Sequence, residues 1–360
     1  MYQKRWFQTL TLFILIFLLI LLISVTDFVF TPILKYIGAV AVPIIGAGIL
    51  FYLTKPVMHF LERFKINRVV AILLVFLLLI LIAFFVILYL SPILQRQFSN
   101  LMANVPSMIR GVENFINYWQ ANQIVIPEEV NNAISDFTNN LQTYLENFIS
   151  HLFGFIGQLI SIIASIVLIP FFLFFMLKDG EKLVPYITQI FEKKKADNIR
   201  TLLQKIDEVL TAFIQGQLIV SFCVGVLLLI GYAIIDLNYA LTLALFGLVM
   251  NVVPFIGPFI AVAPAIIVGA FQDPMMIIWV SLIMIAAQQV ESNFISPNVM
   301  GKVLDIHPLT IITVILAGGS IAGFLGILFA VPFYAVIKTI IGHFYQTYIA
   351  SKEQKNDALI

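Results

Sequence analysis

Two long apolar stretches in the last third of the chain, 239–270 and 309–341, are each interrupted near the middle. The first is broken by Asn251, Pro254, Gly257 and Pro258. The second is broken by Gly318, Gly319 and Ser320, with Gly323 and Gly326 behind them. Such breaks free backbone carbonyls and amides, which at membrane depth are tolerated only inside protein or beside a wet cavity. Paired broken segments therefore predict the binding site of a transporter.

The composition places these stretches in a membrane protein. Of the 360 residues, 61% are hydrophobic and only 11% are charged, and the mean hydropathy is +1.04. A soluble domain is about half apolar and about a quarter charged. The sequence therefore predicts an all-α, polytopic integral membrane protein with about eight membrane segments, two of them broken or re-entrant. The net charge of +1 gives no electrostatic reason to expect nucleic acid as a partner.

Five continuous spans are expected before the first broken stretch. They cover 6–25, 33–53, 69–90, 152–177 and 212–235. Lysine and arginine gather in two connections, 54–68 and 178–205, and basic loops remain in the cytoplasm. Both termini are then cytoplasmic. The first span is interpreted as a retained anchor and not as a cleaved signal peptide.

These spans divide the chain into five predicted regions. Residues 1–94 hold the first three spans, 95–150 form a small helical extracytoplasmic insertion, and 151–211 hold the fourth span and a basic cytoplasmic loop. Residues 212–349 form a transport core, and 350–360 form a cytoplasmic tail. The insertion carries apolar residues at helical spacing in two amphipathic helices. Either a structured cap on the membrane domain or a gate or partner surface would fit this pattern.

The last third of the chain admits two topologies. In the first, 239–270, 275–295 and 309–341 are all spans. In the second, 239–270 and 309–341 are re-entrant hairpins whose tips are the breaks. As one helix, 239–270 would be about 48 Å long, against about 30 Å of hydrocarbon. The hairpin topology places Lys302 in the cytoplasm, so the positive-inside rule favours it on this one lysine.

Glu291 is the best single candidate for transport chemistry. It follows the apolar run Met275–Val290, and on a helix it shares a face with Gln288 and Ser292. A carboxylate in or near a bilayer is costly and usually faces a cavity or a partner. Such a group can exchange a proton for a cation. The simpler alternative is a solvated glutamate at the end of a span.

The remaining candidates lie in the same predicted core. The predicted substrate- or ion-binding residues are Asn251, Pro254, Gly257, Pro258, Gln288, Glu291 and Asn293. The first break could bind a cation through freed carbonyls or a polar solute through the amide of Asn251, or it could be a simple kink. The predicted hinge or packing residues are Gly318, Gly319, Gly323 and Gly326. Gln215 and Gln217 are weaker candidates, and His307 is more simply a loop residue.

Enzyme motifs are missing from the chain. No motif for ATP hydrolysis, zinc proteolysis, dithiol redox chemistry or serine hydrolysis occurs. The four histidines are scattered, so no metal site is expected. The sequence thus predicts neither an enzyme nor a cofactor, and it disfavours transport driven by the chain's own ATP hydrolysis.

A series of motifs extends along the chain from residue 170 onward. The motifs are Pro170–Gly180, Asn251–Pro258, Glu291–Lys302, His307–Leu309, Ala317–Gly326 and Val331–Pro332. In order and spacing the chain resembles the autoinducer-2 exporter family of bacterial membrane permeases. The resemblance implies eight membrane segments in a bacterial inner membrane and export of a small solute such as a quorum-sensing signal. Some members of this family look like sodium(lithium)/proton antiporters, which makes antiport the alternative.

Two further classes stay open at the level of sequence. One is a passive channel, and the other is a membrane scaffold that transports nothing and binds a partner through its external helices. The expected partners are a small-molecule or monovalent-cation substrate and membrane lipid. Faces rich in small residues are compatible with a homo-oligomer.

Overall fold

The computed structural model describes residues 5–97, 99–100, 103–104, 143, 168–273, 275–301 and 306–357. Within these ranges every regular element is a helix, and no strand occurs. Five of the helices are long and apolar enough to cross a membrane. The all-α class is confirmed, and the apolar helices agree with a polytopic membrane protein. The count of eight segments stays a prediction, and most of the 95–150 insertion lies outside the described residues.

The described residues form two compact units. The first takes in the described parts of Met1–Phe51 and Phe155–Leu177. It contains α1 (Arg5–Val25), most of α2 (Asp27–Arg63) and the beginning of α6 (Leu168–Thr188). Gly46 of α2 packs closely on α6, because a Cβ there would lie 3.0 Å from Cδ1 of Ile169. The large apolar side chains of α1 are exposed along most of its length, as expected of a helix surrounded by lipid.

The second unit is organised around one long helix, α7 (Lys193–Ile234). Its 42 residues correspond to about 63 Å, roughly twice the hydrocarbon thickness. The basic connection 178–205 is therefore mostly helical, since α6 continues to Thr188 and α7 begins at Lys193. The same unit contains α3 (Arg68–Phe85), which runs on into the π-helical turn η1 (Val86–Leu90).

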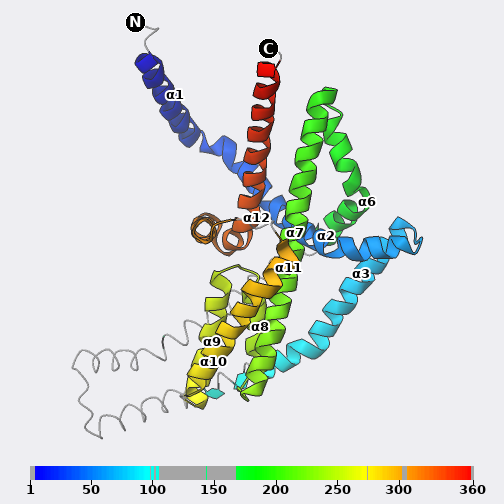
Figure 1. Ribbon diagram of the computed structural model, residues 1–360, viewed down its shortest axis with the longest axis vertical. Helices are drawn as coiled ribbons and strands as arrows, with labels where there is room; N and C mark the ends of the chain where they lie inside the picture. Colours follow the sequence, from blue (N-terminus) through cyan, green and yellow to red (C-terminus); the bar gives the residue numbers. More distant parts are fainter. Residues whose placement is uncertain are drawn as a thin grey trace, which may run out of the picture. The chain divides into compact units, whose positions relative to one another are not determined.

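The first broken stretch is a helical hairpin. Its arms, α8 (Ala240–Met250) and α9 (Ile256–Gln272), pack against each other, and α8 also packs against α7 (Figure 1). The chain reverses over 251–255, where Phe255 has a φ of +64°. Only glycine fits at 257, because a Cβ there would collide with the carbonyl of Met250. With 11 residues, α8 is about 16 Å long, too short to cross about 30 Å of hydrocarbon by itself.

The second broken stretch also folds back on itself, within α12 (Pro308–Asp357). Its helical geometry fails at Ala322 and at Gly323, where φ is +58°. The main chains of Gly318 and Gly326 then lie against each other. The bend falls after the predicted Gly318–Ser320, because Gly323 adopts the left-handed backbone that glycine tolerates best. A break in each stretch is therefore present, and re-entry of the two tips into the membrane stays a prediction.

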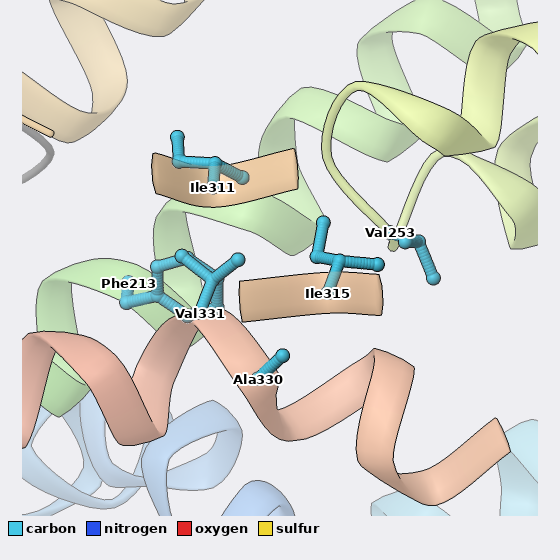
Figure 2. Packing of buried hydrophobic residues seen from close by; sticks show 6 residues of the cluster. All are labelled: Phe213, Val253, Ile311, Ile315, Ala330 and Val331. Carbon is cyan, nitrogen blue, oxygen red and sulfur yellow. The ribbon is translucent and has the colours of Figure 1, made fainter. Parts of the chain in front are cut away.

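A buried apolar cluster joins the two hairpins to α7. Figure 2 shows its six members, which are Phe213, Val253, Ile311, Ile315, Ala330 and Val331. Val253 comes from the tip of the first hairpin, and Phe213 comes from α7. The other four come from the two arms of α12. The tip of the first hairpin is thus held between α7 and the second hairpin.

Candidate functional site

Glu291 lies where a regular helix changes its winding. Helix α10 (Met276–Val290) passes into a π-helical turn, η3 (Glu291–Ile295), and then into α11 (Ser296–Met300). Pro297 has no N–H to offer to the carbonyl four residues earlier, which interrupts the α-helical ladder at this turn. Short π turns inside helices are frequent at functional sites. The turn begins at the half-buried Glu291.

The Glu291 carboxylate accepts hydrogen bonds from two side-chain amides. Nε2 of Gln288 donates to Oε2 at 2.9 Å, and Nδ2 of Asn251 reaches the same oxygen at 3.4 Å. Gln288 is one turn earlier on the same face, as its spacing predicts. Asn251 comes from the tip of the first hairpin and is only 2% exposed. The structure therefore brings the carboxylate and the first break, which the sequence indicated separately, into one site.

Gln217 of α7 completes this group from another direction. Its Nε2 donates to the main-chain carbonyl of Asn251 at 2.7 Å. In a continuous helix that carbonyl would accept from the N–H of residue 255, but the chain turns away at Phe255. Sequence reasoning gave Gln217 little weight because no local pattern links it to the break. The available signal was a polar side chain within an apolar span, and in the structure this side chain is 5% exposed.

The other predicted site residues have different places. Pro254 is half-buried in the turn, and Gly257 and Pro258 are buried at the beginning of α9. Asn293 is exposed and donates to the main-chain carbonyl and to Oε1 of Gln289, both at 2.9 Å. It is therefore not joined to Glu291, although the two are close in sequence.

Three further candidate side chains form hydrogen bonds with partners other than Glu291. Ser292 is exposed and donates to the Gln289 carbonyl at 3.4 Å. His307 is exposed at the beginning of α12, where its Nδ1 accepts from the N–H of Leu309 at 3.3 Å. Gln215 donates from Nε2 to the carbonyl of Tyr52 at 2.7 Å. None of these three hydrogen bonds involves the Glu291 carboxylate.

No basic side chain neutralises Glu291 within the described part of the chain. The ion pairs found there join Lys55 to Asp207, Arg68 to Glu181, Lys182 to Asp179 and Arg200 to Asp197. A carboxylate away from water needs a counter-charge or a proton. Both amides donate to Oε2, and no hydrogen bond from a described residue reaches Oε1. Oε1 is therefore positioned to take a proton or a ligand.

The donor set suits a proton, a monovalent cation or a polar organic solute better than a multivalent metal. No group of three or more histidine, cysteine, aspartate or glutamate side chains comes together among the described residues. Divalent cations usually require several carboxylates. The amide groups of Asn251 and Gln288 can each donate and accept hydrogen bonds, which is the chemistry that binds hydroxyl and carbonyl groups of a solute.

A separate set of polar contacts ties α7 to its neighbours. Lys55 and Asp207 form a 3.0 Å ion pair, and the buried His343 of α12 lies 2.7 Å from Oδ1 of Asn198. A further ion pair does not involve α7 and joins Arg68 of α3 to Glu181 of α6 at 3.0 Å. The hydrogen bond from the Arg68 guanidinium lowers the pKa of the Glu181 carboxyl below its ordinary value. These contacts share no residue with the Glu291 site.

Comparison with known proteins identifies one family along nearly the whole chain. The family profile described as AI-2E family transporter matches residues 10–346. Of two Bacillus subtilis (strain 168) relatives, each named a putative transport protein, YueF is 34% identical over 91% of this chain and 90% of its own length. The other, YrrI, is 28% identical over 92% of this chain and 94% of its own length. A protein of Halobacillus andaensis named sodium-lithium/proton antiporter is 23% identical over 81% of this chain and 86% of its own length.

Proposed function

Because this chain belongs to the AI-2E family of transporters, we propose that it is a secondary transporter that exports a small polar solute in exchange for protons. The observation that carries the proposal is the Glu291 carboxylate, which accepts two amide hydrogen bonds and pairs with no basic side chain in the described residues. Such a carboxylate is stable away from water only with a proton or a bound ligand. Exchange of the proton for the bound solute at this carboxylate would couple the proton flux to the solute flux.

The solute is bound in this proposal by the amides beside Glu291. Asn251 and Gln288 each combine a donor and an acceptor, which suits a small solute rich in hydroxyl groups. A quorum-sensing furanone such as autoinducer-2, after which the family is named, has this chemistry. Export is the direction that the family's name suggests, with the site alternating between the two sides of a bacterial inner membrane and both termini in the cytoplasm.

Sodium(lithium)/proton antiport is the second candidate, and one observation favours it. Oε1 of Glu291, which accepts no hydrogen bond from the described residues, and the amide oxygens of Asn251 and Gln288 are the oxygen ligands that hard cations prefer. A single carboxylate balances a single positive charge, so a monovalent ion fits the site. The antiporter named in Halobacillus andaensis supports this candidate by sequence similarity.

Proton movement in proteoliposomes tests both candidates. Vesicles with an acidic lumen and a lumenal pH dye would receive the signalling furanone, sodium or lithium outside. We expect saturable alkalinisation with one of these probes and none in Glu291→Gln vesicles. A protonophore added with labelled furanone distinguishes coupled uptake from passive flow. Equal responses of wild type and Glu291→Gln would contradict a role for this carboxylate, and non-saturable flux would indicate a channel.

A further inference from the structure

We infer that Gln217 is a positioning residue of the transport site, which holds the hairpin tip so that the side chain of Asn251 reaches Glu291. This inference rests on the proposed function for the role of Glu291. Among the described residues, the Gln217 side chain makes no hydrogen bond to the Glu291 carboxylate. Its action is through the main chain of Asn251.

Two hydrogen bonds link three separate segments, which are α7, the tip of the first hairpin and the π turn η3. Gln217 of α7 donates to the Asn251 carbonyl at 2.7 Å. The side chain of the same asparagine donates to Glu291 Oε2 at 3.4 Å. Gln217 and Asn251 are both buried, so water does not replace the first bond easily. A polar group that loses its only partner in such surroundings is strongly disfavoured.

The hydrogen bond from Asn251 to Glu291 is the one that a small displacement of the hairpin tip would break first. At 3.4 Å it lies beyond the usual range of N–H···O hydrogen bonds, which ends at about 3.2 Å. A further displacement of the tip by a few tenths of an ångström would break it. The short, well-buried bond from Gln217 fixes the tip against α7, and it therefore decides whether Asn251 is within reach of Glu291.

Gly216, the residue before Gln217, packs against α11, which follows the π turn of Glu291. A Cβ at Gly216 would lie 2.7 Å from Cγ of Met300, so α11 packs directly on α7 at this point. Met300 ends α11, the helix that follows the π turn of Glu291. Two consecutive residues of α7 thus set the positions of both segments that meet at the carboxylate. A side chain that served only to fill space would need no donor at this position.

A measurement that does not depend on transport tests the inference. A hydrophobic carbodiimide modifies protonated membrane carboxyls, and peptide mass spectrometry gives the rate at which Glu291 is labelled in the full-length protein. Gln217→Leu removes the donor, and Gln217→Met is a second variant with an unbranched side chain in case the first does not fold. Gln215→Leu is the matched control, because Gln215 also donates to a carbonyl at 2.7 Å but at Tyr52.

We expect Gln217→Leu to accelerate labelling of Glu291 by about tenfold, the equivalent of one hydrogen bond of about 1.4 kcal/mol. Gln215→Leu should label at the wild-type rate. Asn251→Ala should show the same acceleration, and adding Gln217→Leu to it should change nothing further. A folded Gln217 variant that labels at the wild-type rate, or independent effects in the double mutant, would overturn the inference.

The two proposals fail in different ways. If no probe moves protons but Gln217→Leu still changes labelling, the proposed function is wrong and the positioning role stands. If protons move and depend on Glu291 while labelling is unaffected, the positioning role is wrong. Where both hold, Gln217→Leu should also reduce the transport rate for the active probe, and Gln215→Leu should not.

Discussion

The main chains of Gly318 and Gly326 lie directly against each other across the bend in α12, and a Cβ at either position would meet the carbonyl of the other. This contact lets the two arms of the second hairpin approach more closely than side chains allow. All four predicted hinge or packing glycines lie at this bend, but only Gly318 and Gly326 make the main-chain contact. Gly319 instead faces the side chain of Ile327, and Gly323 makes the turn.

The first prediction follows from this contact. Gly326→Ala should lower the free energy of unfolding by about 1–3 kcal/mol, because the added methyl group overpacks the bend. Gly342→Ala is the matched control on the same helix, since a Cβ there meets nothing within 4 Å. It should be neutral or stabilising by up to about 1 kcal/mol. Thermal unfolding in detergent measures both, and equal melting temperatures for the two variants would contradict close packing at the bend.

The hydrogen bond from Gln288 to Glu291 gives the second prediction. Gln288→Leu removes the 2.9 Å donor from the carboxylate, and a hydrogen bond to a charged group is worth about 1.5–3 kcal/mol. We expect a loss of about tenfold or more in kcat/KM for the probe that the wild type transports. Gln289→Leu changes the exposed neighbouring amide and should retain most of the activity. If the two variants are equally active, Gln288 has no part in the site.

A third prediction concerns the contact between α7 and α12. Asn198→Ala leaves the buried ring of His343 without its 2.7 Å partner, which should cost about 1–3 kcal/mol of stability. Asp197→Ala removes the neighbouring side chain, whose contact with Arg200 is an exposed pair at 3.9 Å. Such pairs contribute about 0–1 kcal/mol. Thermal unfolding should therefore distinguish two adjacent alanine substitutions, and a larger loss for Asp197→Ala would be the contrary result.

The pairing of Arg68 with Glu181 makes one part of the stability depend on pH. The pKa of Glu181 is lowered in the folded protein by the Arg68 hydrogen bond. Its contribution is therefore fully present above the ordinary glutamate pKa of the unfolded chain and is lost as the pH falls through the lowered pKa of the folded protein. The melting temperatures of wild type and Glu181→Gln should differ most near neutral pH and converge in acid. The difference in melting temperature should be small because Glu181 is largely exposed. A difference that grows as the pH falls would contradict the prediction.

The position of residue 302 distinguishes the two topologies of the last third. In the hairpin topology, Lys302→Cys lies in the cytoplasm, so an impermeant thiol reagent should label it only after the cells are opened. The variant is made in a Cys223→Ser background, because Cys223 is the chain's single cysteine. A cysteine at Lys355 in the tail serves as a second internal marker. Labelling of position 302 on intact cells would exclude the hairpin topology.

Local patterns in the sequence were sufficient to predict some parts of the site. The three-residue spacing of Gln288 and Glu291 is a helical pattern, and the structure joins the two side chains. The proline and glycine residues after Asn251 predicted a break, which the structure contains. The roles of these residues in transport stay predictions.

Other parts depend on contacts between distant segments. Gln217 and Asn251 are 34 residues apart, and no periodicity along the chain indicates that one would satisfy the carbonyl freed at the other. The sequence names Gly323 as one of four hinge or packing glycines but does not single it out as the bend, because the three small residues at 318–320 are a stronger local signal than one glycine. The π turn at Glu291 had only Pro297 as a sign, and a proline indicates an interrupted ladder without indicating the form that the interruption takes.

The unbroken length of α7 determines where this unit can deform. Its 42 residues contain no internal interruption, whereas its partners are interrupted at 251–255, 291–295 and 322–323. We therefore expect α7 to bend less easily than the segments packed beside it, which are each interrupted at one of these three places. We expect a rearrangement that opens the Glu291 carboxylate to either side of the membrane to change the backbone at these three interruptions while α7 stays straight.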